Sequence, residues 1–74
     1  MAFVRLEKLG HSWVVRMGRG NEPEAAAHWD DLGFAAYSAL SFAEAMGTGT
    51  PELGAGVPED ALKHGDTLKR TIRG

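Results

Sequence analysis

Two segments in which apolar and polar residues alternate meet at Gly10-His11, and this pattern constrains the fold more than any other feature of the chain. A two-residue connection with glycine first is typical of a type II′ turn between antiparallel strands. The turn also sets the register, so Leu9 should pair with Ser12. One face of the predicted hairpin over residues 2–17 then carries Val4, Leu6, Trp13, Val15 and Met17, and the other carries Arg5, Glu7, Val14 and Arg16. Because the turn was assigned without reference to hydrophobicity, this segregation supports the hairpin.

The segment after the hairpin allows two interpretations. Gly and Asn residues at 18–21 end the second strand. The alanines of residues 24–29 favour a helix, and Pro23 could open one. Ala25, Ala27 and Trp29, however, alternate with their neighbours as a strand would. A two-stranded hairpin is marginal in water, so we expect a third strand here.

Residues 30–46 are predicted to form the main helix, capped by Asp30 or Asp31 and ended by Gly47. Its apolar residues fall on one arc that should face the sheet and its two tryptophans: Leu32, Ala35, Ala36, Ala39, Leu40, Phe42, Ala43 and Met46. Two aromatic residues lie on the opposite face. We expect Phe34 to fold back on the preceding loop, and Tyr37 to anchor an interface, because interface hot spots favour tyrosine.

The C-terminal part of the chain is expected to be a loop followed by a second helix. Residues 47–57 are rich in glycine, and residues 58–72 show a narrow helical stripe of Ala61, Gly65, Leu68 and Ile72. Gly65 weakens this helix and could break it in two. The expectation is a single α+β domain over residues 1–74, with a sheet in 1–29, the main helix in 30–46, a loop in 47–57 and a helical segment in 58–72.

Charged residues are strongly segregated along a chain whose net charge is only −2. Residues 1–19 and 63–74 each sum to +3, whereas residues 20–62 sum to −8 and contain no lysine or arginine. If folding gathers these acids, their local field greatly exceeds that of the net charge. We therefore predict a patch that docks on a basic protein surface, formed by Asp30, Asp31 and Glu44 around Tyr37, with Glu22 and Glu24 flanking.

Two other binding functions remain open. Arg5, Arg16 and Arg19 could gather on the polar hairpin face and bind nucleic acid, although an isoelectric point near 5.8 argues against a dominant phosphate-binding surface. The register puts Arg5 opposite Arg16, a like-charge pair that Glu7 could relieve. Alternatively, the alanine-rich helix could pack against a second copy, giving a weak homodimer instead of a monomer.

Several classes of function are disfavoured. The chain has no cysteine, so it has no disulfide framework, thiol nucleophile or thiolate metal site. His28 adjoins Asp30 and Asp31, but these carboxylates already serve as helix cap, and no serine is spaced with a base and an acid. We expect no enzyme, metal or cofactor. No run approaches the ~20 apolar residues of a membrane span, and residues 1–7 lack the apolar stretch of a signal peptide, so a cytoplasmic location is expected.

In size, acidity and its ββ(β)α layout, the chain resembles small phage and mobile-element proteins, among them the anti-CRISPR proteins. The resemblance rests on these global features and carries over no functional residue. It implies an inhibitor that presents carboxylates to a basic nucleic-acid channel or subunit of a host defence complex, in the host cytoplasm.

Overall fold

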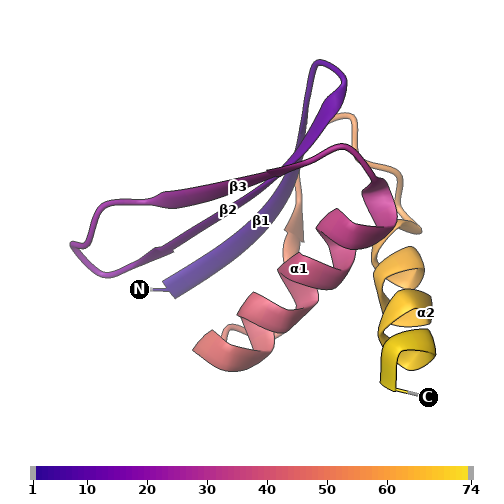
Figure 1. Cartoon of the computed structure of the whole chain (residues 1–74). Coiled ribbons are helices and arrows are strands. Elements are labelled where there is room, and N and C mark those ends of the chain that lie inside the picture. Colours follow the sequence, from indigo (N-terminus) through magenta and orange to yellow (C-terminus); the bar gives the residue numbers. More distant parts are fainter. Residues whose placement is uncertain (1, 74) are drawn as a thin grey trace.

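A computed structural model describes residues 2–73 and shows an α+β fold (Figure 1). The elements in chain order are β1 (Ala2–Leu9), β2 (Ser12–Arg19), β3 (Ala25–Trp29), α1 (Leu32–Met46), β4 (Glu52–Leu53) and α2 (Ala61–Arg73). Both helices lie on one side of the sheet, where α1 packs on the strands and α2 packs on α1. The other face of the sheet carries no helix.

The hairpin has the predicted register. Leu9 pairs with Ser12, and the alternation runs on until Ala2 pairs with Arg19. Gly10 has φ 63°, the left-handed value that the first position of a type II′ turn requires. Val14 lies on the polar face, as the register predicts, but it is only 1% exposed. Its neighbours across the sheet on the same face are Glu7 of β1 and His28 of β3.

The ambiguous segment forms the strand β3, which pairs antiparallel with β2. The expected loop over residues 47–57 was only partly right, because β4 lies within it and pairs parallel with β1. The sheet therefore has four strands in the order β3-β2-β1-β4 and is mixed. A strand of two residues is too short to show an alternating pattern, so sequence periodicity could not predict the pairing of β4 with β1.

Local capping interactions set the ends of α1. The side chain of Asp31 accepts a hydrogen bond from the Phe34 N–H at 2.9 Å, so Asp31 is the N-cap. At the other end Gly47 has φ 69°, and its N–H donates to carbonyl oxygens of the last turn. The helix thus begins two residues later than expected and ends at the predicted residue.

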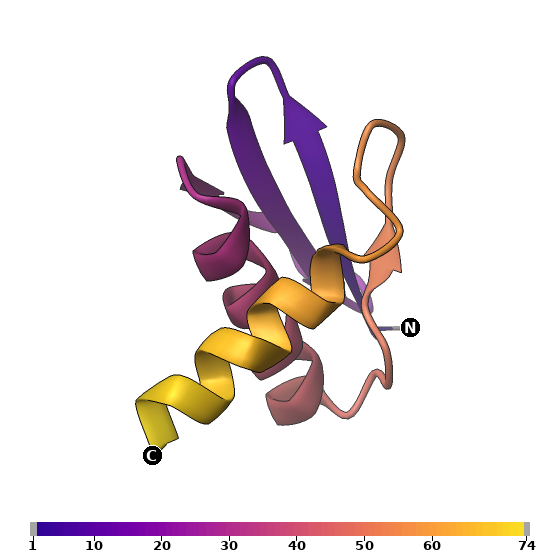
Figure 2. The same cartoon turned by 90° about the vertical axis from the view of Figure 1, so that its right-hand side faces the viewer.

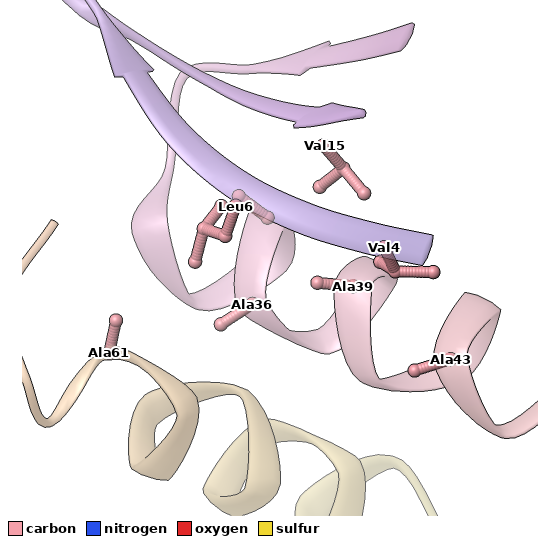
Figure 3. Close-up of a cluster of buried hydrophobic side chains, with 8 residues drawn as sticks. Val4, Leu6, Val15, Ala36, Ala39, Ala43 and Ala61 are labelled. Atoms are coloured by element: carbon pink, nitrogen blue, oxygen red, sulfur yellow. The ribbon is translucent and has the colours of Figure 1, made fainter. Parts of the chain in front are cut away.

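The core is small and rich in alanine. Short side chains let α1 lie close to both of its neighbours: Figure 3 shows Ala39 between α1 and the strand that carries Val4 and Leu6, and Ala36 pointing toward Ala61 of α2. The buried cluster comprises Val4, Leu6, Val15, Ala35, Ala36, Ala39, Ala43 and Ala61. The predicted arc is slightly rotated: Phe42, expected in the core, is 37% exposed, and Ser38, expected outside, is buried.

Helix α2 begins at Ala61, three residues later than predicted, and runs unbroken through Gly65. Gly65 is buried where α2 crosses α1 (Figure 2). A Cβ atom there would lie 2.5 Å from the Ala36 carbonyl carbon and 2.6 Å from the Tyr37 nitrogen. The glycine therefore does not break the helix but permits the close crossing of the two helices.

Candidate functional site

Four of the predicted acids bracket strand β3. Glu22 and Glu24 precede the strand, Asp30 and Asp31 follow it, and all four are exposed. Figure 1 shows the β2–β3 turn at one end of the sheet and the link from β3 to α1 at the other. At about 3.3 Å per residue, Glu24 and Asp30 lie roughly 20 Å apart. We call these four residues the β3 acids.

The other two predicted residues lie elsewhere. Tyr37 is half-buried on the side of α1 that packs against α2. Glu44 lies near the C-terminal end of α1, roughly 20 Å along the helix from Asp31, and its carboxylate is 2.8 Å from the Lys69 ammonium of α2. The structure thus does not gather the six residues into one patch around Tyr37. It places four around β3 and two at the helix–helix contact.

Ion pairing separates the β3 acids from most of the other carboxylates. Five acids lie within 4 Å of a basic side chain: Glu7, Glu44, Glu52, Asp60 and Asp66. Among residues 2–72, whose side chains the structure describes, the β3 acids form no such pair, and the only other acid of which this is true is Glu59. The terminal basic segments therefore neutralise acids outside the β3 region, while the field of the β3 acids is left uncompensated by ion pairs.

Exposed aromatic side chains adjoin the β3 acids. The rings of Trp29 and Phe34 stack with their centroids 6.5 Å apart, and they are 37% and 48% exposed. Phe34 thus folds back as expected, onto the last residue of β3. Asp31 holds this arrangement by capping the helix turn that carries Phe34. Trp29, expected to pack in the core, is exposed because β3 is an edge strand that α1 does not cover. The pattern of residues does not indicate which strand lies at the edge of the sheet.

The basic residues of the alternative interface are mostly paired. Arg5 and Arg16 lie opposite each other, as the register predicted. Glu7 lies 2.8 Å from Arg16 Nε and relieves the repulsion as anticipated, while Glu52 of β4 accepts a hydrogen bond from Arg5 Nε at 3.2 Å. Arg19 is exposed at the end of β2, away from this pair. Two of the three arginines thus have carboxylate partners on the open sheet face.

Two further features bear on the range of possible sites. Within residues 2–73, histidine and carboxylate side chains nowhere gather in threes as a metal ion would require. Over the same residues, neither helix has the length and apolar character needed to cross a membrane.

Comparison with protein-family models, curated proteins and solved structures gave no significant match for this chain.

Proposed function

We propose that the chain is a non-enzymatic protein-binding module that docks on a basic protein surface through the β3 acids. The observation that carries the proposal is that the four exposed β3 acids form no ion pair among the described side chains. Most of the other acids are paired. Unpaired surface charges of one sign accelerate association with an oppositely charged partner and exclude like-charged ones.

The setting implied by the resemblance is a phage-type inhibitor, of the anti-CRISPR kind, acting in the host cytoplasm. A carboxylate surface suits such a function, because it can occupy a basic site that otherwise holds nucleic-acid phosphates. Nucleic acid should then compete with this chain for the captured partner.

Matched charge reversals test the proposal. The chain is immobilised, incubated with nuclease-treated cell lysate, and washed at low salt and at ~0.5 M salt, where screening shortens the range of surface charges. The double variant Glu24→Lys/Asp30→Lys spares the Asp31 cap, and Glu59→Lys changes an exposed, unpaired acid elsewhere.

We expect the wild type and Glu59→Lys to retain a basic protein at low salt and the double variant to retain at least ~10-fold less. Equal retention by all three proteins would refute the proposal.

Nucleic-acid binding through Arg5, Arg16 and Arg19 is less well supported, since ion pairs already engage the first two. A filter-binding titration with mixed DNA and RNA at low salt distinguishes it. Retention that falls on Arg16→Glu and not on Asp30→Lys would favour this second function.

A further inference from the structure

Strand β3 is an open edge of the sheet. Its inner side pairs with β2, and among the described residues no strand lies on its outer side. A two-residue turn makes Leu9 and Ser12 a hydrogen-bonded pair. The backbone N–H and C=O groups of Ser12 and Val14 therefore point toward β1, and those of Trp13 and Val15 point toward β3. The same alternation turns the backbone N–H and C=O groups of Ala26 and His28 outward. An added strand could therefore hydrogen-bond at these two residues.

An apolar strip of exposed and half-buried side chains runs beside this edge. Ala25, Ala27 and Trp29 share the face of Val15, but α1 does not bury them, because it lies over the inner strands. Helix α2 packs on the far side of α1, against Ala36 and Tyr37. At 100° per residue, Phe34 and Phe42 lie on the side of α1 opposite that contact, toward β3. Both aromatic rings are exposed, and the ring of Phe34 stacks on that of Trp29.

At the N-terminal end of β3 this strip leads into a pocket of about 220 Å³. The pocket is lined by apolar residues that include Met17, Ala25 and Met46, and Arg19 and Glu22 also line it. The four β3 acids lie at the two ends of the strand, whereas Arg16, opposite Ala26, is already paired with Glu7. Carboxylates thus flank an uncharged centre at both ends.

This charge pattern disfavours the pairing of β3 with the β3 strand of a second copy. Antiparallel pairing of two β3 strands has its longest overlap when centred on Ala27. That register puts Glu24 opposite Asp30 of the other copy, at both ends. Like charges directly opposite each other destabilise a strand pair. The complementary occupant instead has basic residues at its ends.

We propose that the β3 edge binds an extended segment of a partner protein as a fifth strand, and that this segment has an apolar centre flanked at both ends by lysine or arginine. The inference rests on the proposed function and adds to it the mode of binding and the chemistry of the bound segment. The backbone groups of Ala26 and His28 pair with the segment. Its alternate side chains lie on the apolar strip against Trp29 and Phe34, and its basic ends, about six residues apart, meet Glu24 and Asp30.

The test uses a synthetic peptide of about nine residues, Lys-Arg-Val-Thr-Ile-Thr-Val-Arg-Lys, which supplies the predicted length, alternation and charges. Binding is followed by tryptophan fluorescence and by the amide NMR signals of β3. One control peptide carries N-methyl groups on the central edge-facing residues, which keeps its charge and removes its backbone donors. A second control has glutamate in place of every basic residue.

We expect the basic peptide to bind and to shift the Ala26 and His28 amide signals. The N-methylated peptide should bind at least ~10-fold more weakly, the loss expected for two backbone hydrogen bonds, and the acidic peptide should not bind. On the protein side, Ala26→Pro removes an outward N–H without touching the β2–β3 ladder, and proline is tolerated on edge strands. It should weaken binding similarly while the circular dichroism spectrum is retained.

The outcomes separate the two proposals. If the N-methylated peptide binds as well as its parent, strand addition is wrong, even where Glu24→Lys/Asp30→Lys still abolishes binding and the acidic-surface proposal stands. If the double charge reversal leaves basic-peptide binding unchanged, both proposals fail. A stable dimer that the peptide dissociates would show that a second copy occupies the edge, which also overturns the inference.

Discussion

Replacement of Gly65 by alanine tests the helix crossing that organises the C-terminal half of the fold. An added Cβ would lie 2.5 Å from the Ala36 carbonyl carbon, whereas ordinary contacts begin at 3.4 Å. The helices must therefore separate by about 1 Å, because backbone atoms cannot rotate out of the way as a side chain can. Because the clash is with backbone atoms, the cost lies in the upper part of the range for overpacking, about 2–3 kcal/mol. The gain in helix propensity from glycine to alanine is about 1 kcal/mol and offsets only part of it.

The expected net loss is about 1–2 kcal/mol of unfolding free energy. In a domain of this size, it corresponds to a Tm lowered by roughly 5–15 °C, measurable by far-ultraviolet circular dichroism. Gly33→Ala is the matched control, because its Cβ would meet one side-chain oxygen, Asp31 Oδ2 at 3.0 Å, and no backbone of another helix. The helix propensity gained and the disturbance of the Asp31 cap are similar in size and opposite in sign, so we expect stability to change by no more than about 0.5 kcal/mol. A Gly65→Ala variant at least as stable as the wild type would refute the close crossing.

Five further substitutions can be compared by urea unfolding. Leu6→Ala removes the largest fully buried side chain and should cost about 2–5 kcal/mol of unfolding free energy. This cost is comparable to the whole stability expected of a domain this small, so a variant as stable as the wild type would contradict the core assignment. Asp31→Ala should cost about 1 kcal/mol and Asp30→Ala almost nothing, so equal effects would place the cap wrongly. Gly10→Ala should cost about 1–2 kcal/mol because φ is positive there, and no loss would argue against the turn type. Lys69→Ala removes an ion pair to α1 and should cost at most about 1 kcal/mol; a loss that grows with salt would contradict an electrostatic origin.

The acidic residues show that charge segregation along the chain does not by itself determine which charges lie together on the surface. The block of eight acids was evident from the sequence, but adjacency in sequence does not determine which surface a side chain reaches. Glu44 and Glu52 pair with Lys69 and Arg5, which come from the two basic ends of the chain. These contacts span 25 and 47 residues, so no local pattern predicts them. They leave the β3 acids as the uncompensated group.

The sequence by itself determined the hairpin register and the Gly47 end of α1. It also favoured a strand after the hairpin and limited the N-cap to Asp30 or Asp31. Each of these depends on residues a few positions apart: a two-residue turn, a period of two, or a side chain bonded to an N–H three residues on. Only the tertiary structure decided that Glu52–Leu53 joins β1, that Gly65 marks a helix contact and that β3 is left as an open edge. The physical reason is that these features arise where segments distant in the chain meet, and their energy depends on packing and pairing geometry that no short window of sequence contains.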